Sequence, residues 1–81
     1  MFYVYVLKSV RDKKFYTGHT NNLLRRLREH NDGKNIYSQR YMPWQIVYHE
    51  SFSTELGAIK REKYFKSAAG RRWLKKYVNI V

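Results

Sequence analysis

Cysteine is absent from this sequence, which excludes both a disulfide framework and a zinc site with thiolate ligands. Proline occurs once and glycine four times, and no linker, repeat or low-complexity segment interrupts the chain. No stretch approaches the roughly 20 apolar residues that a membrane-spanning helix needs. The opening segment, MFYVYVLK, is apolar but lacks a basic leader and a small-residue cleavage site. We therefore expect a cytoplasmic protein that does not enter a membrane.

Acidic residues are also scarce, with six against seventeen lysines and arginines, so the formal net charge is +11. Such a charge on a small domain attracts polyanions and speeds their encounter. Nucleic acid is the predicted partner, because neutralising its phosphates releases condensed counterions. On charge alone, an acidic membrane surface or a ribosomal environment remains as an alternative.

The length and the apolar content predict a single domain over residues 1–81. Chains of 81 residues bury about 60% of their unfolded surface, which supports one modest core and no second module. The hydrophobic fraction of 43% is that of a folded domain, and eight tyrosines, four phenylalanines and two tryptophans supply bulky core material.

Local patterns predict a mixed α/β (α+β) fold with the order β-β-α-β-α-α. Helix starts are indicated by Asn or Thr near residues 20–22 and by Ser53 or Thr54, and a break before the last helix by Gly70. The predicted elements are strands 2–8, 15–18 and 44–52 and helices 21–30, 54–66 and 71–77, with a turn at 9–14 and a basic loop at 34–43.

Two tyrosines of the predicted hairpin fall on one face. A turn centred on Val10 and Arg11 places Tyr5 opposite Tyr16, and a shift of the pairing by two residues keeps both on that face. Two phenols there could relay a proton or position a water. The alternative is cross-strand aromatic packing.

Arg26 and His30 lie four residues apart on one edge of the apolar stripe predicted for the first helix. That stripe consists of Leu23, Leu24 and Leu27, whereas Arg25, Arg28 and Glu29 are expected to face solvent. An arginine at the rim of a core suits a phosphate that gains charge in a transition state. His30 could bind phosphate or pass a proton. The alternative is a solvated basic helix face.

Glu62 falls on the apolar side of the second helix, among Ala58, Ile59 and Phe65. A carboxylate there needs a positive partner or a metal ion, since an unpaired buried charge is costly. One carboxylate with several waters can hold Mg²⁺. The alternative is a salt bridge to Arg26 or to a lysine. The other acids are assigned to turns, helix starts or solvated faces, except Glu50, which the sequence does not rank.

The ordered set of motifs resembles the GIY-YIG nuclease domain and its small bacterial members over nearly the whole chain. The matching stretches are YVY (3–5), YTG (16–18), NNLLRRLREH (21–30), REKYFKS (61–67) and GRRWL (70–74). The resemblance implies a three-stranded antiparallel sheet flanked by helices, with a site that binds one divalent ion, Mg²⁺ or Mn²⁺. Relatives include homing endonucleases, restriction enzymes and an excision-repair subunit.

Carried over by position, the resemblance implies a set of catalytic residues, with Glu62 as the metal ligand and Gly18 as the motif glycine. The catalytic set is Tyr5, Tyr16, Arg26, His30 and Glu62. Tyr3 replaces the first motif glycine and Thr17 the second motif's isoleucine. Several nuclease members also use a late asparagine near the site, and Asn79 is the only candidate this late in the sequence.

These features predict a metal-dependent endonuclease that hydrolyses phosphodiester bonds of nucleic acid, DNA ahead of RNA. Tyr5, helped by Tyr16 and metal-bound hydroxide, would deprotonate the water, while Arg26 stabilises the phosphate. Backbone contacts are expected from Lys34, Arg40, Arg71, Arg72, Lys75 and Lys76. The alternative is a catalytically silent basic module that binds nucleic acid or acts through a partner protein. A protein partner could also supply specificity. A structural protein of a ribonucleoprotein particle would explain the charge but not the motif.

Overall fold

A computed structural model describes residues 1–78 as three strands and three α-helices with one short 3-10 helix. Their bounds are β1 Phe2–Ser9, β2 Phe15–Thr20, α1 Leu23–Asn31, the 3-10 helix η1 Ser38–Tyr41, β3 Trp44–Phe52, α2 Glu55–Lys66 and α3 Ala68–Tyr77. The strands form one antiparallel sheet in the order β2-β1-β3. The α+β class and the predicted order β-β-α-β-α-α are therefore confirmed. No helix within residues 1–78 is long and apolar enough to cross a membrane.

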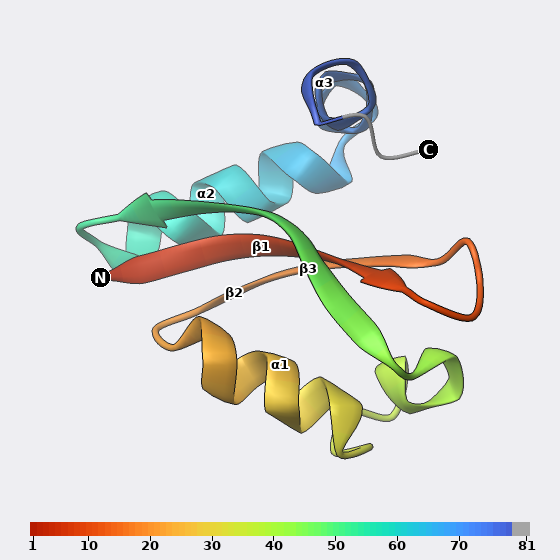
Figure 1. Cartoon of the computed structure of the whole chain (residues 1–81). Coiled ribbons are helices and arrows are strands. Elements are labelled where there is room, and N and C mark those ends of the chain that lie inside the picture. The colour runs from red at the N-terminus through yellow and green to blue at the C-terminus, as the bar shows by residue number, and fades with distance from the viewer. Residues whose placement is uncertain (79–81) are drawn as a thin grey trace.

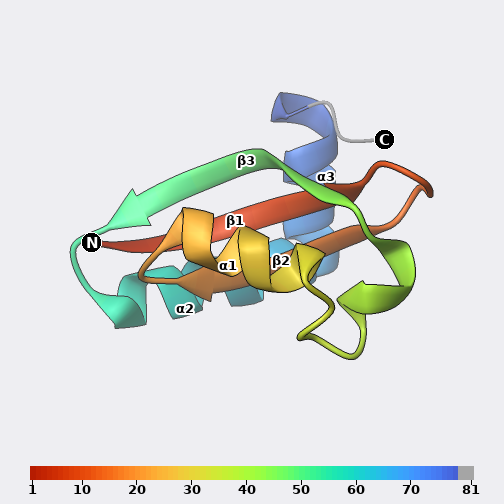
Figure 2. The same ribbon diagram turned by 60° about the horizontal axis from the view of Figure 1, so that its bottom comes forward.

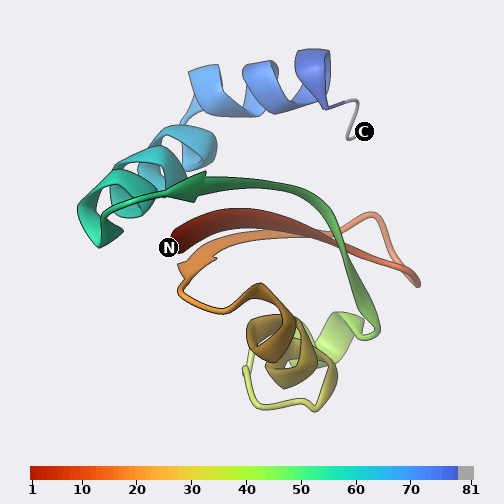
Figure 3. The same cartoon turned by 60° about the vertical axis from the view of Figure 1, so that its left-hand side comes forward.

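Helices cover both faces of the sheet. Helix α1 lies on one face, and α2 and α3 lie on the other (Figures 1 and 3). Seen from the α1 side, the sheet separates α1 from the other two helices (Figure 2). The central strand supplies both cores, because Val4 and Val6 pack toward α2 and α3, whereas Tyr5 and Leu7 pack toward α1.

The hairpin pairs Tyr5 with Gly18 and Leu7 with Tyr16, so its register is shifted by two residues from a turn centred on Val10 and Arg11. The Ser9 hydroxyl causes the longer loop, since it accepts hydrogen bonds from the backbone N–H groups of Arg11 and Asp12. Tyr5 and Tyr16 still share one face of the sheet, as the side-chain alternation predicts.

Helix α1 buries a different stripe from the predicted one. Its cap is Asn22, whose side chain accepts from the Arg25 N–H. Leu23 and Leu27 pack on the sheet, but Leu24 is exposed. The prediction for Leu24 was wrong because the fully buried residue His30 turns the inner face of the helix toward positions 23, 27 and 30.

The corner between α2 and α3 also differs from the prediction. Thr54 caps α2 as expected. Gly70 does not break the chain but lies inside α3, which begins at Ala68. Ser67 ends α2 and caps α3, because its hydroxyl donates to the Tyr64 carbonyl (2.5 Å) and accepts from the Gly70 N–H (3.1 Å). Instead, the missing side chain of Gly70 allows α3 to pack closely against the backbone of α2.

Candidate functional site

Three residues of the predicted site meet beneath the sheet. Tyr5 reaches from β1 toward α1, where its hydroxyl lies 3.1 Å from His30 Nε2 and accepts a hydrogen bond from Arg26 Nε at 3.2 Å. Gly18 lies opposite Tyr5 in the hairpin, and a Cβ atom there would stand 2.6 Å from the Tyr5 hydroxyl. Glycine is therefore required at position 18 to leave room for the phenol.

Burial sets the protonation of this cluster. Tyr5 is 1% exposed and His30 is 0% exposed. Burial raises the pKa of Tyr5 to about 12, although Arg26 opposes the shift. Burial, helped by Arg26, lowers the pKa of His30 to about 4. At neutral pH a phenol therefore faces a neutral imidazole, so neither the role of Tyr5 as a solvent-contacting base nor a phosphate contact of His30 fits this geometry.

Ser38 completes the cluster, and sequence reasoning missed it. Its hydroxyl donates to the Asn35 carbonyl at 3.4 Å and lies 2.8 Å from His30 Nδ1. Nδ1–H then donates to Ser38, which leaves Nε2 to accept the Tyr5 proton. The resulting chain of donors runs from Arg26 through Tyr5 and His30 to Ser38. Nothing in the polar segment 34–43 distinguishes this buried serine from its exposed neighbours.

We expect the substitution Ser38→Ala to change the tautomer of His30. Without the hydroxyl, the buried Nδ1–H has no acceptor, an arrangement that costs about 1–3 kcal/mol. The ring is then expected to carry its proton on Nε2 and to donate to the Tyr5 oxygen. Nitrogen-15 NMR of the imidazole measures this directly. Ser53→Ala, at an exposed serine, is the control, and a His30 spectrum that stays the same in Ser38→Ala would contradict the donor chain.

We also expect His30 to make the protein less stable in mild acid. Its pKa is about 4 in the folded protein and 6.5 in an unfolded chain, so the unfolded state binds more protons between these values. The free energy of unfolding should therefore fall as the pH drops from 6.5 toward 4, by roughly 2–3 kcal/mol in all. In urea unfolding of His30→Gln, the free energy of unfolding should not show this fall between pH 6.5 and 5. The exposed-residue variant His49→Gln should keep it, and an equal slope in both variants would refute the assignment.

Arg26 is held at the edge of the cluster with its guanidinium partly open. Its side chain is 33% exposed, and Nη1 donates to Glu29 Oε1 at 3.0 Å. Glu29 was predicted to face solvent but contacts Arg26, whose hydrogen bond lowers the pKa of Glu29 below its ordinary value. Arg26 also lines a hollow of about 280 Å³ together with Arg25 and His19. A guanidinium fixed by two partners and open to a hollow suits a bound phosphate.

Glu62 makes no hydrogen bond with the Tyr5 cluster, because α2 lies on the opposite face of the sheet, although its charge helps to raise the pKa of Tyr5. Its Oε1 is 2.5 Å from Nδ1 of His19, and its Oε2 accepts from Lys66 Nζ at 2.6 Å. Burial raises its pKa, but the hydrogen bonds from Lys66 and His19 outweigh burial and hold the pKa of Glu62 below its ordinary value. Of the predicted alternatives, the lysine pairing is found and the Arg26 pairing is not. The i,i+4 spacing of Glu62 and Lys66 would have revealed this partner.

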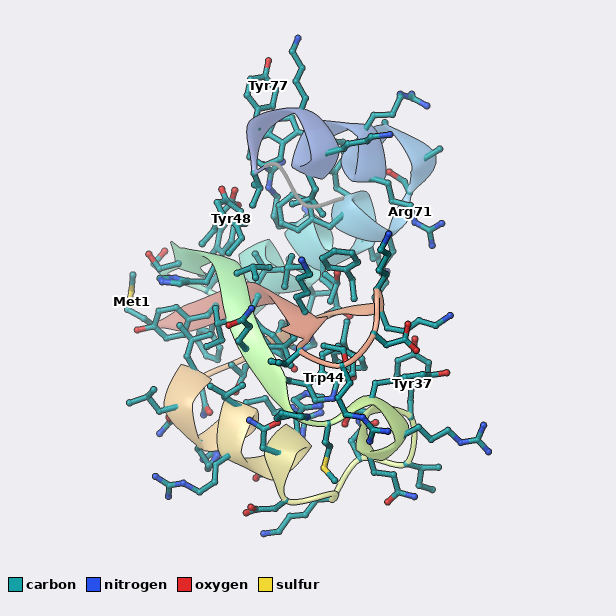
Figure 4. The ribbon with its side chains drawn as sticks, turned by 45° about the vertical axis from the view of Figure 1, so that its right-hand side comes forward. Met1, Tyr37, Trp44, Tyr48, Arg71 and Tyr77 are labelled. Atoms are coloured by element: carbon teal, nitrogen blue, oxygen red, sulfur yellow. The ribbon has the colours of Figure 1, made fainter. Side chains whose placement is uncertain are left out.

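A groove of about 710 Å³ runs over the outer edge of β2. One side carries Tyr16 and Tyr37, whose rings lie 6.0 Å apart, and the other carries the cations of α2 and α3. Figure 4 shows Tyr37 and Arg71 on opposite sides of the β1–β2 hairpin. Of the predicted backbone-binding residues, Arg71 and Lys75 line this groove, and Lys66 joins them unpredicted; the lining does not include Lys34, Arg40, Arg72 or Lys76. Asn79 lies outside the described residues.

The chain belongs to the GIY-YIG family, since the sequence model of the GIY-YIG catalytic domain matches residues 1–77. Among curated proteins it is similar to UPF0213 proteins of bacteria. It is 48% identical to one from Bacillus licheniformis over 79% of this chain and 66% of the relative. It is 38% identical to UPF0213 protein YazA of Bacillus subtilis over 86% of this chain and 71% of the relative. The chain thus spans about two thirds of the length of these relatives.

GIY-YIG nucleases generally depend on a divalent ion, for which Glu62 is the predicted ligand. The described part of the chain holds no group of three or more His, Asp and Glu side chains that could bind a metal. Glu62 nevertheless fits a single ion with water ligands, because its carboxylate is ionised and already carries one cation, the Lys66 ammonium. Lys66 is more exposed than Glu62, so its flexible side chain can move away and let a metal ion bind the carboxylate.

Proposed function

We propose that this chain is an endonuclease that hydrolyses phosphodiester bonds of nucleic acid, DNA ahead of RNA. Membership of the GIY-YIG family supports the reaction class. The observation that carries the proposal is the Arg26 guanidinium, which a buried phenol orients and a hollow exposes. Homing endonucleases and restriction enzymes, which have domains of this family, favour DNA as the substrate. We also propose that residues 1–81 act as one domain.

Each residue of the candidate site then has a distinct role. Arg26 stabilises the charge that develops on the phosphate. Tyr5 and His30 position Arg26, because both are buried away from substrate. Tyr16, whose ring lies 4.6 Å from His30 and lines the groove, orients the attacking water. Glu62 would hold the divalent ion, which as a Lewis acid assists departure of the leaving oxygen.

The cations of the groove would hold the sugar–phosphate backbone. Lys66, Arg71 and Lys75 line one wall, and contacts of this kind fix the position of a strand without reading its bases. The exposed Lys34, Arg40, Arg72 and Lys76 would add to the long-range attraction instead. A protein partner is the proposed source of any sequence specificity.

A second candidate is a basic module that binds nucleic acid without cleaving it. The Lys66 ammonium on Glu62 favours this alternative, since it occupies a position that the metal would need. Both functions predict binding that weakens as the salt concentration rises. The two functions differ in whether the Glu62 carboxylate is needed, because only cleavage requires it as a metal ligand.

The deciding experiment is cleavage of labelled plasmid, branched and single-stranded DNA and RNA with Mg²⁺ or Mn²⁺. The protein is compared with Glu62→Gln and with Asp12→Asn, which removes the same charge from the exposed β1–β2 loop. Metal-dependent cleavage that only Glu62→Gln loses would support the nuclease. Absence of cleavage, or equal cleavage by all three proteins, together with salt-sensitive binding would overturn it in favour of the binding module.

A further inference from the structure

Glu62 is held between two groups of different chemistry, and the difference bears on which metal the site accepts. His19 Nδ1 lies 2.5 Å from Oε1 and Lys66 Nζ lies 2.6 Å from Oε2. The side chains of His19, Glu62 and Lys66 are 33%, 16% and 55% exposed. The carboxylate is therefore the fixed member, Lys66 is the loose one, and His19 presents a ring nitrogen to the same oxygen that a metal would use.

The spacing of His19 and Glu62 is close to that of two neighbouring metal ligands. Nitrogen and oxygen ligands lie about 2.0–2.2 Å from a first-row divalent ion, so two adjacent ligands are about 3 Å apart. The present separation of 2.5 Å needs to open by only a few tenths of an ångström. His19 also lines the 280 Å³ hollow beside Arg26, where waters or a phosphate oxygen can complete the coordination shell.

We propose that His19 and Glu62 together form a site for a divalent metal that accepts imidazole, such as Mn²⁺ or Co²⁺, and that the metal displaces Lys66. Mg²⁺ takes oxygen ligands and keeps several waters, whereas imidazole suits iron, nickel, copper and zinc best; Mn²⁺ and Co²⁺ accept one imidazole beside carboxylate and water oxygens. The inference deepens the proposed function, on which it rests, by naming the class of metal and a second protein ligand. The Nδ1 proton, which now bonds to Oε1, passes to solvent while Nε2 carries the ring's remaining proton, and the Nδ1 lone pair that is freed binds the ion.

Displacement of Lys66 links metal binding to the groove. Lys66 lines that groove beside Arg71 and Lys75. Once the metal occupies Glu62, the Lys66 ammonium loses its carboxylate partner and becomes free to contact a phosphate. Loading the metal therefore adds a cation to the wall that holds the backbone, and metal binding and nucleic-acid binding should strengthen each other.

The test is pulsed electron paramagnetic resonance of the protein loaded with Mn²⁺ alone, in which a directly bound imidazole produces a nitrogen modulation. The unchanged protein should show it, and His19→Gln should lose it together with about 10-fold or more of its Mn²⁺ affinity. His19→Gln should keep its weaker affinity for Mg²⁺. The exposed histidine of β3 supplies the matched control, His49→Gln, which should leave the modulation unchanged.

Lys66→Gln provides an independent readout at an exposed position. Removal of the competing ammonium should raise the Mn²⁺ affinity roughly two- to fivefold, as expected for a surface ion pair. An unchanged or lower affinity, or Mn²⁺ bound at Glu62 without nitrogen modulation, would overturn the inference. If Mg²⁺ supports cleavage but the Mn²⁺-loaded protein shows no nitrogen modulation, the metal assignment is refuted and the proposed nuclease activity is retained. Nitrogen modulation without cleavage of any nucleic acid would support the site and refute the nuclease.

Discussion

Arg26→Ala should slow cleavage of nucleic acid by roughly 100-fold or more. Removal of one group that stabilises developing charge commonly has an effect of this size in an enclosed site. The fold should survive, because Tyr5 keeps its hydrogen bond to His30 and Glu29 loses only a partly exposed partner. The measurement is the single-turnover rate at saturating protein, with urea unfolding as the check on stability.

Two further variants make the Arg26 result specific. Arg28 lies on the same helix but is exposed, so Arg28→Ala removes an equal charge and should reduce only the salt-sensitive binding. Arg26→Lys keeps the charge but lacks the Nε–H that donates to Tyr5, so it should be nearly as slow as Arg26→Ala. Full activity of Arg26→Lys would show that the Tyr5 contact has no role.

Gly70→Ala should destabilise the protein by about 3 kcal/mol or more, although alanine normally stabilises a helix by about 1 kcal/mol relative to glycine. A Cβ atom at position 70 would lie 1.8 Å from the Tyr64 carbonyl oxygen and 2.6 Å from the Phe65 Cα atom. Both atoms belong to the backbone of α2, so no side chain can move aside. The two helices must separate, which disturbs the packing of Phe65 and Leu74. Urea unfolding followed by circular dichroism measures the loss.

The neighbouring residue separates this effect from helix propensity. Ala69 is exposed in the same turn, so Ala69→Gly should cost only about 1 kcal/mol. A Gly70→Ala protein as stable as the unchanged one would mean that α2 and α3 do not approach as closely as described.

Local signals predicted most of the fold because they act within a few residues. Alternating side chains identified β1, and the candidate caps at residues 20–22 and 53–54 identified two helix starts, of which the structure uses Asn22 and Thr54. Predictions failed where packing between elements decides the position of a residue. The buried position of His30 turned α1 away from Leu24, and the carbonyl of Tyr64 explains Gly70, which the sequence pattern marked as a break.

The residues of the candidate site also fall into those that the sequence predicted and those that it missed. The motif pointed to Tyr5, Arg26 and His30, and these residues do lie together. It said nothing of Ser38, which lies in the polar loop outside the motif, or of His19, whose partner Glu62 is far along the chain. The motif also could not reveal that Tyr5 is sealed from solvent, since the depth of a side chain depends on how α1 packs against the sheet.

The outer edge of β2 has a consequence for solubility. An edge strand offers unpaired backbone groups to which a second chain can add, and such edges promote aggregation. Here Lys66, Arg71 and Lys75 stand over that edge, in a protein whose formal net charge is +11. A second copy that approached along β2 would bring its own lysines and arginines against these three. The same charges that attract a polyanion therefore keep the molecules of this protein apart from one another.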